Sequence, residues 1–397
     1  MAYIKKVGLS LKENWMAIGR SPIFYYTMLS IVTIYVATIR YIILVDLVGQ
    51  DLEPYFIGSF FICMILSLLI GAFVNRRLNV KGHLIWNLSG LIFGITLMLS
   101  VSGLNGLLLY SILGGFSLGF CIPGIITHVI NMTNYENRGS ISGIFLMITY
   151  VLIIIGTLFI NTAIQLGIFL SLVKIVNIFI ASKIDFMKSL PIESPFIKYG
   201  TTVKVSFALI WIIFLLVNAI ATASISKHVS AYDIELIQTV SFVIGLISMF
   251  VGGLIMDYKG RKKLLVFCYA YLGLEYAMVS LSGGELMRYT FLDGIAWGIL
   301  TLYFLMVLAG DIIFPKMRVV FVSVILALSI IGQYLTQIFY MEIGVQIDQI
   351  FPLTVLFLFI AAVMVLLLPE TLPDKFLRKK ELQDYIQKAK KIKEKRL

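Results

Sequence analysis

The sequence predicts an all-α integral membrane protein in which twelve transmembrane helices form two six-helix pseudo-repeats. Three observations support this fold class. The 397 residues are 60% hydrophobic and only 13% charged, with a mean hydropathy of +0.98, whereas soluble domains are about one quarter charged. Apolar runs of about 20 residues, the length of a bilayer crossing, recur along the whole chain. Three short motifs recur in the two halves at nearly one spacing.

The apolar runs predict the spans and the division of the chain. We expect spans at 23–46, 55–74, 83–102, 104–130, 140–161, 163–182, 203–226, 236–256, 264–282, 288–311, 318–343 and 350–368. The resulting segments are a cytoplasmic N-terminus (1–22), an N-terminal six-helix half (23–182), a central cytoplasmic loop (183–202), a C-terminal six-helix half (203–368) and a basic cytoplasmic tail (369–397). Of the nine prolines only Pro123 falls deep inside a span, where a missing backbone N–H disturbs a helix most.

Lysine and arginine predict the orientation, because clustered cations resist translocation. The segments on the side of the N-terminus carry 28 of these residues, or 18 without the tail, and the opposite loops carry two, Lys227 and Arg288. We therefore expect a multi-pass protein of the plasma membrane with both termini in the cytoplasm. The net charge of +11 reflects this asymmetry and the attraction of the tail to anionic lipid, so it does not indicate a nucleic-acid partner.

A charged hairpin between the eighth and ninth spans is the stretch around which the chain is organised. Gly253 and Gly260 allow backbones to approach closely and the chain to turn. Asp257 stands at a helix end, and Arg261 and Lys262 are among the cations that hold the bend at the cytoplasmic surface. A hairpin that served only charge asymmetry would not need glycine and aspartate at these positions.

Three pairs of motifs predict that a unit of six spans was duplicated. The matched positions are Gly71 and Gly253, Arg138 and Arg318, and Pro191 and Pro369, which are 182, 180 and 178 residues apart. In the first half, Arg76 follows Gly71 and Glu136 precedes Arg138. The first-half hairpin is degenerate, because it lacks Gly-Arg-Lys after its arginines.

The pattern Gly253-x-x-x-Asp257 followed by Gly260-Arg261-Lys262 resembles the loop signature of the major facilitator superfamily, although Tyr258 occupies a position that is usually basic. Acidic, proline-flanked motifs follow the sixth and twelfth spans, so the chain is similar to the sugar-porter-like branch over residues 20–375.

This resemblance implies two parallel six-helix halves, with spans one, four, seven and ten around a central cavity. It implies that Asp257 and Arg261 belong to a charge cluster that closes the cytoplasmic ends when the cavity opens outward. The other residues assigned to such conformational motifs are Gly71, Arg76, Glu136, Arg138, Gly253, Gly260 and Lys262.

Charged residues inside spans are costly enough to suggest function. They are Arg40, Lys174, Glu275, Asp293 and Asp311. Carboxylates are the titrating groups available in the spans, so we assign proton coupling to Asp293, with Glu275 as the next candidate. Asp293 and Arg40 both lie near the outer face, where a charge pair between them would close an outer gate. Lys174, with Asn177 and Ser171, is attributed to packing or snorkelling.

The tenth span carries an acid near each end. Asp293 and Asp311 are eighteen residues apart, which is about five helical turns, so both are expected on one face with Trp297 between them. We expect Asp311 to be an interfacial partner of Lys316 or Arg318.

Polar residues on four spans are the candidates for solute binding. Tyr26, Thr33 and Arg40 recur every seven residues and form a stripe on one face of the first span. Arg40 either binds a carboxylate, phosphate or sugar hydroxyl, or it extends outward as a structural anchor. The remaining candidates are Asn218, Trp297, Gln333 and Gln337. Polar residues of this kind also join membrane helices without any ligand.

These features predict a secondary active transporter that moves a small polar solute, such as a sugar or an organic acid, by alternating access with proton-coupled uptake. An exporter of drugs or metabolites is the alternative, and a nontransporting membrane sensor or scaffold is a further one. Nothing in the sequence resembles a phosphate-binding glycine loop, metal-ligand spacing or a nucleophilic triad, so we expect no enzyme activity, cofactor or metal. The expected partners are the solute, a proton and the bilayer, and the expected state is a monomer.

The topology makes a first testable prediction. Single cysteines introduced at Val80, Asn137, Phe196 and Lys380 should react with an impermeant maleimide only from the cytoplasmic side, because an even number of spans precedes each of these positions. Reaction of the position in the tail from outside would overturn the count of twelve.

Overall fold

The computed structural model describes residues 21–45, 53–74, 80–99, 104–184, 199–228, 231–282, 290–342 and 347–374, and positions 376–378, 382, 385, 386 and 389 of the C-terminal segment. Within these ranges only the backbone is described at 38–45, 53–57, 80, 104–110, 223, 225–228, 231–235, 238, 333–342 and 347–350.

The described residues of the N-terminal half form seven helices. They are α2 (Pro22–Val45), α3 (Glu53–Val74), α4 (Val80–Met98), α5 (Leu104–Gly119), α6 (Ile122–Asn131), α7 (Arg138–Phe159) and α8 (Ala163–Ser182). Pro123 lies in the first turn of α6, where its missing N–H costs little, so the fourth span is divided into α5 and α6. Thr162 and Gln165 form a capping box that starts α8.

The C-terminal half repeats this pattern. Its elements are α9 (Thr201–His228), α10 (Ala231–Lys259), α11 (Lys262–Leu281), α12 (Gly294–Leu302), the π-helix η2 (Tyr303–Val307), α13 (Leu308–Ile312), the 3₁₀-helix η3 (Pro315–Met317), α14 (Arg318–Glu342) and α15 (Ile347–Leu367). When α5 is joined to α6, and α12 to η2 and α13, the described helices form twelve rods.

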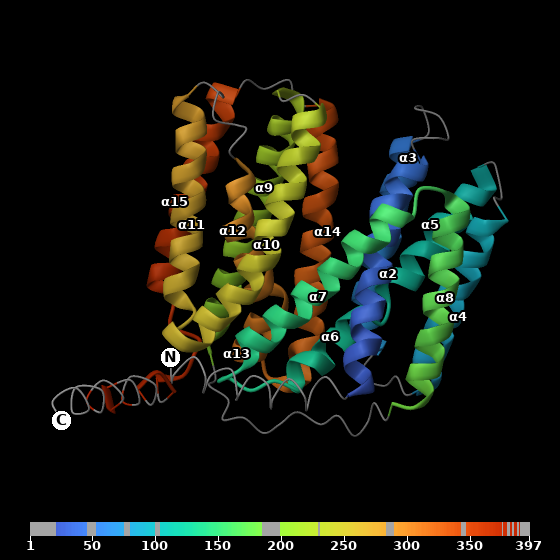
Figure 1. Ribbon diagram of the computed structural model, residues 1–397, viewed down its shortest axis with the longest axis horizontal. Helices are drawn as coiled ribbons and strands as arrows, with labels where there is room; N and C mark the ends of the chain where they lie inside the picture. Colours follow the sequence, from blue (N-terminus) through green and yellow to red (C-terminus); the bar gives the residue numbers. More distant parts are fainter. Residues whose placement is uncertain are drawn as a thin grey trace.

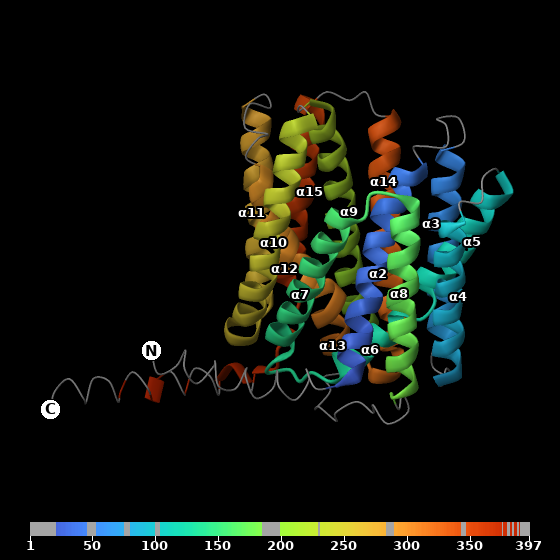
Figure 2. The same ribbon diagram turned by 45° about the vertical axis from the view of Figure 1, so that its right-hand side comes forward.

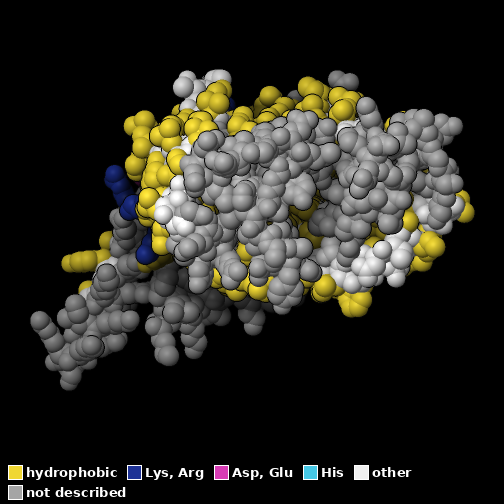
Figure 3. Space-filling view, turned by 90° about the horizontal axis from the view of Figure 1, so that it is seen from above, with side chains coloured by type: hydrophobic (Ala, Val, Ile, Leu, Met, Phe, Trp, Pro, Cys, Tyr) yellow, Lys and Arg dark blue, Asp and Glu magenta, His cyan; other side chains and the backbone are white. Residues whose placement is uncertain are grey.

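The described helices have the length and surface of membrane spans. Eight of them are long and apolar enough to cross a bilayer, and Pro22–Ala37, Gly58–Val74 and Phe351–Leu367 are shorter apolar helices. Large apolar side chains such as Ile85, Leu88 and Ile92 of α4 are exposed, and hydrophobic side chains occupy much of the visible rim in Figure 3. The prediction of an all-α, multi-pass membrane protein is confirmed.

The helices form two bundles, one of α2–α8 and one of α9–α15 (Figures 1 and 2). The bundles meet mainly where α7 packs against α10 and where α14 packs against α3 and α6. They converge at the lower side of both views, where α6, α13 and the start of α7 lie, and they diverge toward the upper side. The start of α2 also lies on the lower side, which we call the closed end.

Glycines bring α7 and α10 into backbone contact across the two halves. A Cβ added to Gly253 would lie 2.3 Å from the carbonyl oxygen of Gly139, and one added to Gly139 would lie 2.6 Å from the carbonyl oxygen of Gly253. Gly143 repeats this contact one turn later, against the carbonyl oxygen of Met249 at 2.5 Å. Only glycine permits this approach, which is why the hairpin motif requires Gly253.

Substitution of Gly253 by alanine should therefore force α7 and α10 apart. The overpacking should cost roughly 1–3 kcal/mol and lower the melting temperature of the purified protein. Gly200→Ala is the matched control, because a Cβ there meets no atom within 4 Å. Equal melting temperatures for the two variants would contradict the close contact.

Candidate functional site

One buried carboxylate joins the two halves at the closed end. Asp311 of α13 is fully buried and forms ion pairs with Arg138, the first residue of α7, and with Arg261, between α10 and α11. Thr371 Oγ1 donates a further hydrogen bond of 3.1 Å to Asp311 Oδ2. The expectation that Asp311 pairs with Lys316 or Arg318 is therefore wrong, because the chain turns inward at α13 and places the carboxylate between the halves.

Both arginines are also held by oxygen atoms of the loop before α7. Arg138 donates from Nε to Thr133 Oγ1 at 3.1 Å and from Nη2 to the carbonyl oxygen of Thr133 at 3.2 Å. Arg261 Nη2 donates to the carbonyl oxygen of Tyr135 at 3.0 Å. Burial works against the charge of Arg261, but the carboxylates of Asp311 and Asp257 outweigh it and raise the pKa of Arg261. Arg261 therefore remains a cation in the closed end.

A second carboxylate binds the N-terminus of α7. Asp257 accepts hydrogen bonds from the backbone N–H groups of Gly139 at 2.8 Å and Ser140 at 2.7 Å, and from the Ser140 hydroxyl at 2.8 Å. The free N–H groups and dipole of a helix N-terminus favour an anion. Arg261 Nη2 lies 3.6 Å from Asp257 Oδ1, so this carboxylate also belongs to the same cluster of charges.

A third carboxylate binds the N-terminus of α11. Glu370 accepts from the backbone N–H groups of Arg261 and Lys262, each at 3.0 Å. Gly260 has φ of +94°, and a Cβ there would lie 2.7 Å from Glu370 Oε2, so the turn requires glycine. Tyr199 donates to the carbonyl oxygen of Glu370 at 3.1 Å, and burial raises the pKa of Tyr199 to about 12. The motif after the last span is thus attached to the hairpin.

A third arginine, Arg318, forms a contact that corresponds, by the internal repeat, to the Arg138–Asp311 pair. Arg318 Nη1 donates to Asn131 Oδ1 of α6 at 2.5 Å, and Nη2 donates to the carbonyl oxygen of Gly310 at 2.9 Å. Asn131 precedes Asp311 by 180 residues, as Arg138 precedes Arg318. The two contacts across the halves are therefore equivalent, but only one contains a carboxylate. We call the residues of these contacts the charge network: Arg138, Asp257, Arg261, Asp311, Arg318 and Glu370.

Aromatic side chains from both halves meet above the charge network. Tyr150 of α7 packs against Phe242 of α10 and Trp297 of α12, with ring centroids 5.4 and 5.9 Å apart. The Tyr150 hydroxyl donates to the Tyr35 hydroxyl of α2 at 3.2 Å. These four residues, which we call the aromatic cluster, place Trp297 at the contact between the halves.

The tenth span does not present one continuous face. The π-helix η2 interrupts the α-helix between Asp293 and Asp311, and one extra residue in a turn rotates the remainder of the helix by about 100°. The expected alignment of the two acids on one face is therefore wrong. Asp311 belongs to the charge network, and Asp293 accepts from the Ser241 hydroxyl of α10 at 2.5 Å.

The second acid assigned to proton coupling lies close to the first. Both carboxylate oxygens of Glu275 on α11 are buried and form no hydrogen bond with the described residues. Asp293 is near enough to act on Glu275 electrostatically. The structure thus brings the two predicted coupling residues into one region of the C-terminal half.

The predicted solute-binding residues are not gathered around one described cavity. Tyr26 is buried inside the N-terminal bundle and accepts from Asn87 Nδ2 at 2.8 Å, and Thr33 donates to the carbonyl oxygen of Ser30 at 2.7 Å. Asn218 on α9 is half-buried. The predictions for the side chains of Arg40, Arg76, Gln333 and Gln337 lie outside the described residues.

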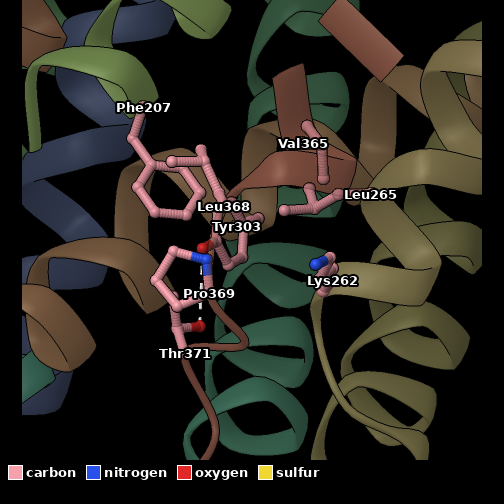
Figure 4. A pocket seen from close by; sticks show the side chains of 8 residues that line it. All are labelled: Phe207, Lys262, Leu265, Tyr303, Val365, Leu368, Pro369 and Thr371. Atoms are coloured by element: carbon pink, nitrogen blue, oxygen red, sulfur yellow. Dashed lines mark hydrogen bonds between the residues drawn. The ribbon is translucent and has the colours of Figure 1, made fainter. Parts of the chain in front are cut away.

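The other motif residues, two in the first half and one in the second, differ in their roles. Gly71 packs against α5, because a Cβ there would lie 1.8 Å from the carbonyl oxygen of Phe120. Glu136 is exposed. Lys262 is half-buried and lines a narrow crevice with Tyr303, Leu368 and Thr371 beside the charge network (Figure 4). This crevice is too narrow to hold a solute.

Sequence reasoning did not assign roles to Glu370, Tyr35 or Tyr150. The proline-flanked motif around Glu370 was visible as a repeat, but its target, the N-terminus of α11, depends on where the last span ends in space. The two tyrosines lie in ordinary apolar runs, so no sequence pattern distinguished them from other residues of the spans.

Comparison with known proteins identifies the fold. No family sequence model matches the chain, and no curated protein matches it in sequence. The structure of the human organic anion transporter MFSD10 (TETRAN) matches with a TM-score of 0.62 and 9% identity over 87% of this chain and 98% of that chain. The structure of the major facilitator superfamily proton:xylose symporter XylE, bound to 6-bromo-6-deoxy-D-glucose, matches with a TM-score of 0.61 and 13% identity over 88% and 96%. At such identities the likeness establishes the fold alone, and that fold is the major facilitator fold.

Neutralisation of Asp311 should open the closed end. Asp311→Asn leaves two buried arginines without their shared carboxylate, which should destabilise the closed interface by roughly 3–5 kcal/mol. Spin labels on the exposed positions Asn134 and Lys263 should then move apart, as measured by double electron–electron resonance. Asp374→Asn, an exposed acid at the same end, should leave the distance unchanged. Identical distances in both variants would refute the role of Asp311.

Proposed function

We propose that this chain is a member of the major facilitator superfamily and acts as a secondary active transporter, without enzyme activity, for a small polar solute. In this proposal the protein works as a monomer in the plasma membrane, with both termini in the cytoplasm, and the closed end faces the cytoplasm. The fold and the apolar surface support the membrane part of the proposal.

The observation that carries the proposal is the nature of the contact between the halves. A permanent interface would be expected to bury a continuous apolar core. Here the closed end is joined by the charge network, whose partners come from α7, α10, α13 and the segment after α15. Each of these charged groups can be solvated when the halves separate, so the contact is suited to being broken and made again.

Alternating access follows from this arrangement. With Asp311 bound by Arg138 and Arg261, the ends of α7, α10 and α13 are held together, and a solute reaches the protein from the diverging side. When solute binding draws the upper parts of the bundles together, the two bundles rock about the aromatic cluster and the charge network separates. The rings of Tyr150 and Trp297 are in contact, and in this proposal they form the pivot and sense a solute between the halves.

Asp293 and Glu275 are the groups we assign to proton coupling. Both lie in the C-terminal half, near the ends of α11 and α12 away from the charge network. Asp293 accepts from the Ser241 hydroxyl, and both carboxylate oxygens of Glu275 are buried, so in this proposal each acid holds a proton away from bulk water. Proton loss would then accompany rearrangement of α10 against α12, the two helices that Ser241 and Asp293 connect.

The solute class we propose is a sugar, an organic acid or a similar metabolite, taken up with protons. One matched structure is an organic anion transporter and the other a proton:xylose symporter, so xylose and a dicarboxylate panel are suitable first probes. The alternative is export of the same solutes, and the direction of the measured flux distinguishes export from uptake.

Uptake into proteoliposomes tests the proposal. The protein should accumulate a labelled solute of the panel when the lumen is more alkaline than the medium, and it should not do so without a pH gradient. Asp293→Asn should abolish accumulation yet retain exchange of solute across the membrane, because exchange needs no net proton movement. Asp374→Asn should transport as the wild type does. Normal accumulation by Asp293→Asn would make that residue structural, and no flux of any probe would refute transport of this solute class.

A further inference from the structure

A buried lysine lies inside the N-terminal bundle, far in sequence from the charge network. Lys174 of α8 is 1% exposed. Its Nζ lies 4.0 Å from the ring centroid of Trp86 on α4 and donates to the carbonyl oxygen of Ser117 on α5 at 3.3 Å. A Cβ added to Gly90 would lie 2.4 Å from Lys174 Cε. The lysine therefore occupies a space that a glycine of the neighbouring helix leaves for it, and it does not extend toward a membrane surface.

Among the described side chains no carboxylate forms an ion pair with this lysine, and the side chain of Glu53 at the start of α3 lies outside them. Between residues 54 and 182 the sequence contains a single acid, Glu136, which is exposed in the loop before α7. The described ion pairs include none with Lys174. A buried cation without a counter-ion is strongly disfavoured, so Lys174, whose described hydrogen bond goes to a carbonyl oxygen, differs from Arg138 and Arg261, which pair with the Asp311 carboxylate.

The surroundings nevertheless suit a cation better than an anion. Beside the indole face and the Ser117 carbonyl oxygen, Asn87 of α4 and Asn177 of α8 lie close in sequence to Trp86 and Lys174, and their Oδ1 atoms are buried without a hydrogen-bond partner among the described residues, Lys174 included. Aromatic faces and amide oxygens stabilise an ammonium group. The sequence expectation of packing or snorkelling does not account for these unused acceptors.

The titratable groups around Lys174 are all able to be neutral. They are Cys121 between α5 and α6, and Tyr26 of α2 and His83 of α4, which are connected to the site by the ring contacts of Tyr26 with Trp86 and with His83. Cys121 is close enough to Lys174 to act on it electrostatically. Water exclusion and the lack of an ion pair with a described acid favour the free amine, whereas the indole face and the oxygens favour the ammonium. The site therefore contains features that favour each of the two forms.

We propose that Lys174 is a proton-binding site of the N-terminal half. In the protonated state the ammonium is held by Trp86 and the Ser117 carbonyl oxygen, and in the other state the proton has left to water and a free amine remains. The site reaches the first span through α4, because Asn87, next to Trp86, donates to the Tyr26 hydroxyl. Its use as a coupling site in transport rests on the proposed function, but proton binding itself does not.

Tryptophan fluorescence of the purified protein in micelles tests the proposal. An ammonium at the indole face changes the emission of Trp86, so emission should show a titration step between about pH 5 and about pH 10, the range that brackets buried and exposed lysines. Trp86 is one of four tryptophans, so the step is assigned to it by comparison with the variants. It should be absent in Trp86→Phe and in Lys174→Met.

Lys174→Arg separates a proton site from a fixed cation. Arginine does not lose its proton in proteins, so this variant should fold and should show no step. Lys183→Met, at the exposed end of the same helix, is the control and should retain the step. A flat titration in the wild type, or a step that persists in Lys174→Arg, would overturn the proposal. The readout requires no solute, so failure of the transport proposal would leave this result unchanged.

Discussion

The closed end depends on one buried carboxylate that is shared by two arginines from different segments. Asp311 is fully buried and accepts from Arg138 at the start of α7 and from Arg261 at the start of α11. A buried charge must be paired and hydrogen-bonded to be tolerated, so the three residues are mutually required. Asp257 and Glu370 obey a related principle, since each carboxylate binds the N–H groups at a helix start. These electrostatic contacts hold the ends of α7, α10, α11 and α13 and join the two halves, and water can replace them when the halves separate.

The duplication is preserved in position but not in chemistry. The Arg138–Asp311 contact has its counterpart in Arg318–Asn131 at the same spacing of 180 residues, yet an amide replaces the carboxylate. In the same way Gly253 brings α10 against α7 across the halves, whereas Gly71 packs against α5 within its own half. The Arg318–Asn131 contact is therefore a hydrogen bond from a charged arginine to a neutral amide, not an ion pair.

The ionisable residues inside the bundles divide between the halves. The acids Asp293, Glu275 and Asp311 all lie in the C-terminal half, and the N-terminal bundle has Lys174 with an aromatic face and unused amide oxygens around it. Each half therefore contains a group whose protonation its surroundings can influence. Lys174 lies on α8, which packs against α2, and Glu275 lies on α11, which packs against α10 and α12. A transporter that couples proton movement to rocking of two bundles requires such groups on at least one side.

The sequence by itself determined the class of fold, the helix positions, the duplication and the hairpin motif. These depend on local hydrophobicity and on short sequence patterns, and Asp257, Arg261 and Arg138, which these patterns assign to conformational motifs, lie in the charge network. Only the tertiary structure decided the partner of Asp311, the target of Glu370, the aromatic cluster around Tyr150 and the buried setting of Lys174. Partners of this kind lie more than a hundred residues apart, or on different helices, and the π-turn at Tyr303–Val307 rotates one of them away from its expected face. Spacing along one helix cannot reveal such contacts, because they are set by how the helices pack.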